Sequence, residues 1–212
     1  MKRCKSIRSL MSKIIAVFVE GDTEVEFYRA LIEKLRECQG AAFDCKFEVK
    51  NMRGVGNYKL DAGRKLDVLR KKFPDDEIHV FLCFDTDVFD FSKNPPIQVD
   101  AVKNSLLEKS AKKVTVIRAK RSIEDWFLYD MEGIARYLRL PTDTKRPKGS
   151  GQEALKALFK KKNRVYSKGL KTEGFIEHLD IVKIMKQVCC EIKPLCKSIG
   201  IDCNKVCKNK SN

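Results

Sequence analysis

The sequence is poor in histidine, with only His79 and His178 among its 212 residues. Neither has an evident partner for proton transfer, which argues against histidine-based hydrolytic chemistry. The sequence also has no apolar run approaching the roughly 20 residues that a bilayer-spanning helix needs. A Gly-x-x-x-x-Gly-Lys-Ser/Thr motif is absent too, so no P-loop nucleotide site is expected in this sequence. These absences remove membrane-spanning proteins, P-loop ATPases and histidine-based enzymes from the predictions.

Features of a secreted protein are equally scarce. A basic start runs into an apolar segment that stops at Glu20 without a small-residue cleavage site, so residues 1–12 are predicted to be a basic leader rather than a signal peptide. The cysteines number nine, an odd count, and Cys83 lies within an apolar run. That usage is typical of free thiols rather than of a disulfide framework, and we expect a cytoplasmic protein.

The C-terminal part raises the alternative of a zinc site, because five of the cysteines gather there. These are Cys189, Cys190, Cys196, Cys203 and Cys207. No Cys-x-x-Cys pair occurs among them, so buried or idle thiols are the favoured interpretation.

Positive charge is what the sequence has in excess. Lys and Arg total 44 against 29 Asp and Glu, a formal net charge of +15. Such an excess indicates a polyanionic partner, nucleic acid first, with a generally solvated basic surface as the alternative. The densest stretch is residues 141–171, which hold ten Lys/Arg against two acids, and Tyr166 there offers a ring for base stacking. The predicted nucleic-acid contacts are Lys145, Arg146, Lys148, Lys160, Lys161, Lys162, Arg164, Tyr166, Lys168 and Lys171.

Two apolar, β-prone runs end abruptly in carboxylates. Residues 14–19 precede Glu20, and residues 78–84 precede Asp85 and Asp87. Apolar runs of this length predict strands that are buried on both faces of a parallel sheet. If the two strands are neighbours, the three acids emerge at the same carboxyl edge of the sheet, where α/β folds bind ligands.

The order of elements predicts an α/β, Rossmann-like fold. Further strands are expected at residues 43–49 and 114–117, and helical patterns separate the strands. This alternation predicts a mainly parallel four-stranded sheet flanked by helices. The expected division is an α/β domain over residues 13–120 and a basic helical C-terminal extension over residues 121–212. One helix of that extension is expected to run from residue 172 to 190.

Three converging carboxylates repel one another unless a cation lies between them. Hard oxygen ligands suit Mg²⁺, or Mn²⁺, which keeps its other positions for water and substrate phosphate. Such a metal activates water and neutralises a leaving oxygen without histidine or a covalent step. Solvated acids at strand ends are the alternative explanation.

The segments Val19-Glu20-Gly21-Asp22-Thr23-Glu24 and Phe84-Asp85-Thr86-Asp87 resemble the two motifs of a TOPRIM domain. That family has a glutamate after its first strand and an Asp-x-Asp pair after its third. The resemblance covers about residues 13–118. It implies that Glu20 is a general acid/base or metal ligand and that Asp85 and Asp87 bind magnesium.

The segment Ser122-Ile-Glu124-x-Trp126, together with the Glu20-Gly-x-Thr-Glu24 form, is most similar to the OLD-like and RloB-like branch of that family. Members of this branch include nuclease effectors of bacterial anti-phage systems. By this likeness Glu24 and Glu124 would join the metal site. Helix capping is the alternative role for Glu24, and a first-turn acid favoured by the helix dipole is the alternative for Glu124.

The position of a third acid limits the resemblance. The longer topoisomerase pattern has a third acid two residues beyond the pair, but Phe89 occupies that position and Asp90 follows it, so the number of metals stays open. The loop Arg53-Gly-Val-Gly is a further candidate phosphate contact through its amides, although a lone glycine loop is a weak signal.

The sequence therefore predicts a magnesium-dependent nuclease that hydrolyses DNA or RNA, transfer RNA included, and that acts as a toxic effector in phage defence. A controlling ATPase or sensor would be a separate chain. One alternative is a non-catalytic module that binds nucleic acid or docks on a partner. Another is a nucleotidyl transferase or primase-like enzyme, for which no triphosphate site is evident.

Overall fold

The computed structural model describes residues 12–39, 45–90 and 97–202. The basic leader predicted over residues 1–12 therefore lies almost wholly outside the described residues, as do Cys203 and Cys207. The side chain of Asp90 is also outside this description. No helix of the described chain is both long and apolar enough to cross a membrane.

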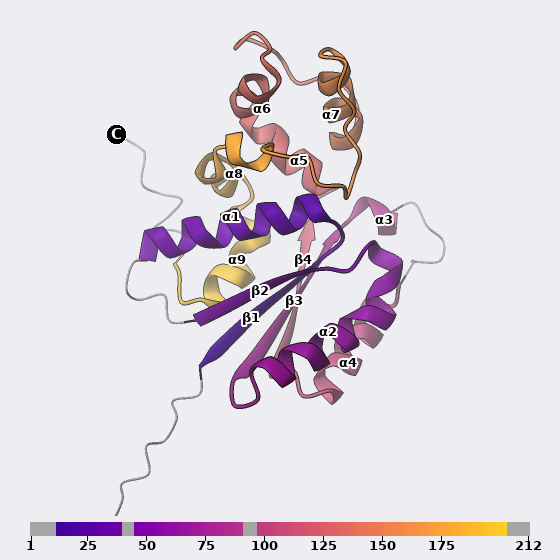
Figure 1. Ribbon diagram of the computed structural model, residues 1–212, viewed down its shortest axis with the longest axis vertical. Helices are drawn as coiled ribbons and strands as arrows, with labels where there is room; N and C mark the ends of the chain where they lie inside the picture. Colours follow the sequence, from indigo (N-terminus) through magenta and orange to yellow (C-terminus); the bar gives the residue numbers. More distant parts are fainter. Residues whose placement is uncertain (1–11, 40–44, 91–96, 203–212) are drawn as a thin grey trace, which may run out of the picture.

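A four-stranded sheet forms the centre of the molecule (Figure 1). Its strands are β1 (Lys13–Val19), β2 (Cys45–Asn51), β3 (Glu77–Asp85) and β4 (Lys113–Ala119). Their order is β2-β1-β3-β4 and every neighbouring pair is parallel, which confirms the predicted α/β class and parallel sheet. Since β1 and β3 are adjacent, their carboxyl ends lie side by side.

The strands are apolar throughout because both faces of the sheet are covered. On β1, Ile15, Val17 and Val19 pack on the side of α1, whereas Ile14 and Phe18 pack with α2 and α4. This alternation places α1 and α9 on one face and α2 and α4 on the other (Figure 1). Successive residues of a strand point to opposite faces, so an unbroken apolar run fills both cores.

The remaining elements follow the alternation that the sequence predicts. The helices of the α/β part are α1 (Asp22–Gln39), α2 (Tyr58–Lys72), α3 (Asp87–Asp90) and α4 (Val99–Glu108), with a 3₁₀ turn, η2 (Val55–Asn57). The C-terminal part contains α5 (Ile123–Phe127), η3 (Leu128–Asp130), α6 (Met131–Leu138), α7 (Gly151–Lys160), η4 (Ile176–His178), α8 (Ile181–Gln187) and α9 (Cys189–Ser198).

The C-terminal helices share one core with the sheet. Phe27 of α1 packs against Trp126 and Phe127 of α5, with ring centroids 6.0 and 5.3 Å apart. Most of these helices lie beyond the carboxyl ends of the strands, above α1 in Figure 1. Elements far apart in sequence therefore border the edge of the sheet where the acids emerge.

The single helix predicted over residues 172–190 is wrong. The chain breaks there into η4, α8 and α9. Leu179 and Asp180 take extended backbone conformations, and the Asp180 carboxylate accepts a hydrogen bond from the Lys183 amide at 2.9 Å. A new N-cap therefore begins α8 inside the periodic apolar pattern, which by itself carries no sign of the break.

Candidate functional site

Glu20 and Asp85 meet at the carboxyl edge of the sheet. Glu20 follows the last residue of β1, and Asp85 is the last residue of the adjacent strand β3. The Asp85 amide donates to Glu20 Oε1 at 3.2 Å, which brings the two carboxyl groups to the same place. Asp87 begins α3 two residues later. It lies close enough to Glu20 for its charge to raise the pKa of that group.

Two further glutamates come to this edge from helices. Glu24 of α1 is 5% exposed and Glu124 of α5 is 1% exposed, so both carboxyl groups are buried. Tyr166 donates its hydroxyl to Glu124 Oε1 at 3.1 Å. The second oxygens, Glu24 Oε2 and Glu124 Oε2, are buried and have no hydrogen-bond partner among the described residues, and the same holds for Asp87 Oδ1. Buried carboxylates without partners are costly, and a bound cation would offset that cost.

A small cavity lies between these carboxyl groups. Its volume is about 10 Å³, and Glu20, Glu24 and Asp85 line it together with the apolar floor of the site. Tyr28 and Cys83 form part of that floor, and burial raises the pKa of the Cys83 thiol to about 12, so the thiol is neutral. A space of this size fits one water molecule or ion.

Backbone contacts between neighbouring loops hold Asp85 in position. The Ile123 amide donates to Asp85 Oδ1 at 2.9 Å. The loop after β3 is tied to the loop after β4, since the Thr86 amide donates to Ala119 O at 3.1 Å and the Asp87 amide to Arg121 O at 3.0 Å. The acids that follow β3 are thus fixed by the adjacent strand and its loop.

A C-terminal segment closes one side of the site, and we call residues 166–171 the strap. Lys168 Nζ lies 2.6 Å from Asp85 Oδ2. The Asp22 amide donates to Gly169 O at 2.8 Å, and the Thr23 hydroxyl donates to Leu170 O at 2.6 Å. The first turn of α1 is therefore bonded to the strap through the Asp22 amide and the Thr23 hydroxyl.

The strap approaches the start of α1 so closely that only glycine fits there. A Cβ on Gly21 would lie 2.4 Å from the Cα of Gly169 and 2.8 Å from Glu24 Oε2. Glu26 also pairs with Lys171 of the strap at 3.0 Å. Gly21 therefore makes room for a segment that follows almost 150 residues later in the sequence.

The carboxyl groups hold their protons more tightly than isolated acids do. Burial is the main cause of the raised pKa of Glu20, with repulsion from Asp87 and Glu124 added, while the Asp85 amide and Lys168 oppose it. Burial, with Glu124 and Glu20 nearby, raises the pKa of Glu24 to about 7. Burial raises the pKa of Asp85 well above its usual range even though the Lys168 ammonium opposes this. The cluster thus favours added positive charge, whether protons or a cation.

The raised pKa of Glu24 makes the stability of the metal-free protein depend on pH. A carboxyl group whose pKa is raised from 4.5 to about 7 by folding contributes most stability below pH 4.5 and loses it as the pH rises to 7. The loss amounts to up to about 3 kcal/mol for Glu24. In EDTA, we expect Glu24→Gln to unfold at a higher temperature than wild type at pH 8. Its melting temperature should also change less between pH 5 and 7.

Thermal melting of both proteins across that pH range, with EDTA and then with Mg²⁺, measures the effect. Mg²⁺ should restore stability to wild type at pH 8 more than to Glu24→Gln. An equal change of melting temperature between pH 5 and 7 in the two proteins would show that Glu24 does not titrate in this range.

The predicted nucleic-acid residues fall into two groups. Lys145, Lys148, Lys160, Lys161 and Lys162 are exposed, in the loop before α7 and at its end. The others are engaged within the protein. Arg146 pairs with Asp125 at 2.6 Å, Arg164 stacks on Tyr137 with 4.3 Å to the ring centroid, and Lys168 and Lys171 hold the strap.

Tyr166 differs most from its predicted role. Its side chain is 2% exposed and its hydroxyl reaches Glu124 beneath the acidic cluster. It supports the site from inside rather than offering a ring for base stacking. The basic composition of the surrounding segment gave no sign of this burial.

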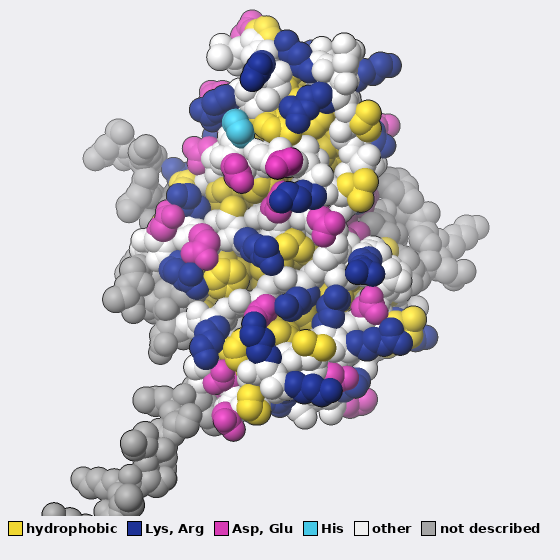
Figure 2. Space-filling model, in the orientation of Figure 1, with side chains coloured by type: hydrophobic (Ala, Val, Ile, Leu, Met, Phe, Trp, Pro, Cys, Tyr) yellow, Lys and Arg dark blue, Asp and Glu magenta, His cyan; other side chains and the backbone are white. Residues whose placement is uncertain are grey.

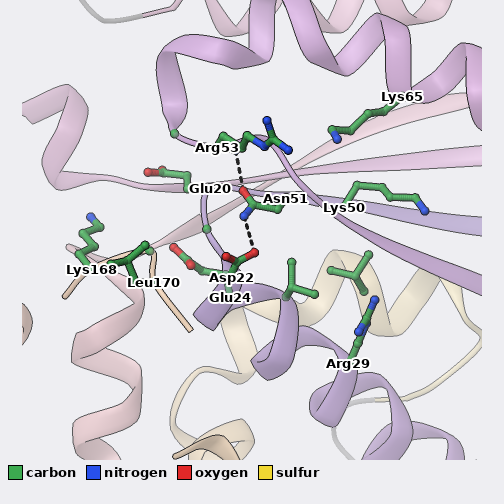
Figure 3. Close-up of a pocket in the computed structure, with 15 residues that line it drawn as sticks. Glu20, Asp22, Glu24, Arg29, Lys50, Asn51, Arg53, Lys65, Lys168 and Leu170 are labelled. Atoms are coloured by element: carbon green, nitrogen blue, oxygen red, sulfur yellow. Dashed lines mark hydrogen bonds between the residues drawn. The ribbon is translucent and has the colours of Figure 1, made fainter. Parts of the chain in front are cut away.

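A larger cleft, of about 900 Å³, opens beside the acidic cluster (Figure 3). Glu20, Glu24 and Lys168 stand at one end of it. Basic side chains also line it, namely Arg29 of α1, Lys50 of β2, Arg53 of the loop after β2 and Lys65 of α2. Arg53 belongs to the glycine loop noted in the sequence, but the amide of Gly54 is used to donate to Glu20 O at 2.8 Å. The loop therefore offers a guanidinium to the cleft, which the sequence did not indicate.

The donor set of the acidic cluster suits a hard cation. In the described ranges, no three His, Cys, Asp or Glu side chains are already arranged to hold a metal ion. Asp85 is instead paired with the Lys168 ammonium, which supplies positive charge at the cluster. Oxygen ligands from carboxylates are the chemistry that Mg²⁺ or Mn²⁺ requires, and Glu24, Asp87 and Glu124 each have a buried carboxylate oxygen without a hydrogen-bond partner among the described residues. Of the C-terminal cysteines that the structure describes, Cys189 and Cys190 are free thiols.

Comparison with protein-family models, curated proteins and solved structures gives no match to this chain. The functional argument therefore depends on the geometry of the site and on the sequence resemblance described above.

Proposed function

We propose that this protein is a magnesium-dependent nuclease that hydrolyses phosphodiester bonds of DNA or RNA. The observation that carries the proposal is a group of five acids at the carboxyl edge of a parallel sheet, of which three are buried and three border an ion-sized cavity. Its acids are Glu20, Glu24, Asp85, Asp87 and Glu124. The excess of positive charge, +15 over the whole chain, supports a polyanionic substrate.

Glu20, Asp85 and Asp87 would hold the metal, with Glu24 and Glu124 completing its surroundings. When bound, Mg²⁺, or Mn²⁺ in its place, supplies the charge that neutralises the phosphate and makes water nucleophilic. The negative charge of the acids attracts the ion, and a bound cation would lower the raised pKa values of Glu20, Glu24 and Asp85.

Protein groups provide the remaining parts of the reaction. Glu20 has a raised pKa, which makes it a stronger base than an isolated carboxylate, and it borders the open cleft, where it could accept a proton from the attacking water. The Lys168 ammonium lines the same cleft and can turn from Asp85 to the phosphate oxygens or the leaving oxygen. Its side chain is 26% exposed, so it has access to a ligand as well as to Asp85.

The TOPRIM assignment forms part of the proposal. It is supported by the glutamate after β1 and the Asp-x-Asp pair that begins with the last residue of β3, the two features that carry the sequence resemblance. A role as an effector of phage defence, controlled by a separate ATPase or sensor, rests on the resemblance of the Glu20 and Ser122 segments to the OLD-like and RloB-like branch.

Incubation with four substrates tests the proposal, namely plasmid DNA, single-stranded DNA, single-stranded RNA and bulk transfer RNA. Each is incubated with Mg²⁺, with Mn²⁺ and with EDTA. We expect cleavage of at least one substrate with either metal and none with EDTA. Metal-independent cleavage, or no cleavage of any substrate at high protein concentration, would contradict the proposal.

A further inference from the structure

We infer that the cleft lined by Arg29, Lys50, Arg53 and Lys65 binds the phosphate backbone of a single polynucleotide strand next to the acidic site. This inference rests on the proposed function, because the cleft is taken as the continuation of that site. It differs from the sequence prediction, which located the nucleic-acid surface in residues 141–171.

Charge separates the two ends of the cleft (Figure 3). The acids Glu20, Asp22 and Glu24 lie towards one end with Lys168. Arg29, Lys50 and Lys65 lie towards the other end, and Arg53 lies between the two groups. A strand whose scissile phosphate lies at the acids would continue between basic walls. In Figure 2, Lys and Arg side chains are prominent on the lower half of this face, where β2 and α2 lie.

The cations of the cleft are available to a ligand. Arg29, Arg53 and Lys65 have no ion-pair partner among the described residues, and Arg29 and Arg53 are exposed. Lys50 is the exception, since it pairs with Glu48 at 2.9 Å. Unpaired Lys and Arg side chains on opposite walls of a cleft are the usual contacts to phosphate oxygens.

Arg53 is also held in place by the backbone. Its φ is 58°, an uncommon conformation for a residue with a side chain. Its amide donates to Asn51 Oδ1 at 2.6 Å, and Asn51 Nδ2 in turn donates to Asp22 Oδ1 at 2.6 Å. These bonds fix the loop that carries Arg53 against the start of α1, next to Glu20 (Figure 3).

The size of the cleft selects a single strand. About 900 Å³ is at the upper end of pockets that hold a drug-sized ligand, which corresponds to a few nucleotides. A duplex, whose major groove alone is about 12 Å wide, is too large to enter between these walls. DNA and RNA share the backbone phosphates that the cleft would recognise, so single-stranded DNA and single-stranded RNA are both candidate ligands.

Binding of fluorescein-labelled oligonucleotides, measured by fluorescence anisotropy with Ca²⁺ in place of Mg²⁺, tests this inference separately from cleavage. The probes are dT15, rU15 and a blunt DNA duplex of 15 base pairs. We expect wild type to bind one or both single strands more tightly than the duplex. We expect Arg53→Gln/Lys65→Gln to weaken that binding about tenfold and to lower the slope of log Kd against log salt by about 1.4, or 0.7 per lost contact.

Two control variants, each of which also loses two positive charges, are compared with the cleft variant. Lys193→Gln/Lys197→Gln removes two exposed charges from α9 and should change the affinity less than twofold. Lys160→Gln/Lys161→Gln removes two charges from the surface that the sequence predicted, and should have a smaller effect than the cleft variant.

An unaltered affinity in the cleft variant, an equal loss in either comparison variant, equally tight duplex binding, or no strand binding by wild type would each overturn the inference. Strand binding that depends on Arg53 and Lys65, without Mg²⁺-dependent cleavage, would instead overturn the proposed nuclease and leave the cleft as a binding site.

Discussion

Asp85→Asn should reduce Mg²⁺-dependent cleavage by a factor of about 10³, because a metal ion typically stabilises the transition state by several kcal/mol. Asparagine keeps the shape of the side chain and can still accept the hydrogen bond from the Ile123 amide, which measures 2.9 Å in the native protein. What it removes is one negative charge at the centre of the cluster. The expected result is therefore a loss of metal affinity and of cleavage with little change in fold.

Asp75→Asn provides the matched control. Asp75 is an exposed acid that lies just before β3, at the opposite end of the strand from Asp85. The same substitution there should leave cleavage within twofold of wild type. Initial rates on the substrate that wild type cuts, with melting curves for each protein, measure the difference. Equal activity of Asp85→Asn and wild type would place the chemistry elsewhere in the chain or in a contaminant.

Lys168→Met should reduce cleavage by a factor of about 10² to 10³, the usual loss when one preorganised donor to a developing negative charge is removed. Burial lowers the pKa of Lys168, but Asp85 and the neighbouring acids more than offset this and raise it overall, so the side chain is fully charged at neutral pH. Methionine retains the aliphatic packing of the strap and removes the ammonium.

Metal affinity distinguishes a role of Lys168 in the reaction from a role in maintaining the fold of the site. If the ammonium acts on substrate, Lys168→Met should lose cleavage while it binds Mn²⁺ at least as well as wild type, because a competing cation has left Asp85. Lys193→Met, an exposed lysine of α9, serves as the control. A variant that loses metal binding and thermal stability together would show that Lys168 supports the fold of the site and does not act in the reaction.

The framework of the site could be predicted from local sequence because it depends on local patterns. Unbroken apolar runs fill both cores of a parallel sheet, so the strands before Glu20 and Asp85 were evident from residues 14–19 and 78–84. Since parallel strands end at one edge, the proximity of these two acids followed from topology once β1 and β3 proved to be neighbours.

The parts of the site that depend on long-range packing could not be predicted. Lys168 and Tyr166 come from the strap, and nothing in a basic, polar segment distinguishes a lysine that pairs with Asp85 from one in solvent. Arg53 was noted only for its glycine neighbours, although its side chain borders the cleft. Contacts of this kind arise from the packing of distant elements and leave no periodic signal in sequence.

Titration of Mn²⁺ into the metal-free protein, followed by electron paramagnetic resonance of the free ion, would show whether the carboxylates bind a metal, and it needs neither the natural substrate nor an activating partner. Wild type and Glu20→Gln/Asp85→Asn would be compared at pH 8, where the raised pKa of Glu24, about 7, leaves most of that carboxyl ionised. The account predicts saturable Mn²⁺ binding by wild type that Mg²⁺ displaces and that the double variant loses. Equal binding by both proteins, or none by wild type, would contradict the proposal that these carboxylates form a metal site.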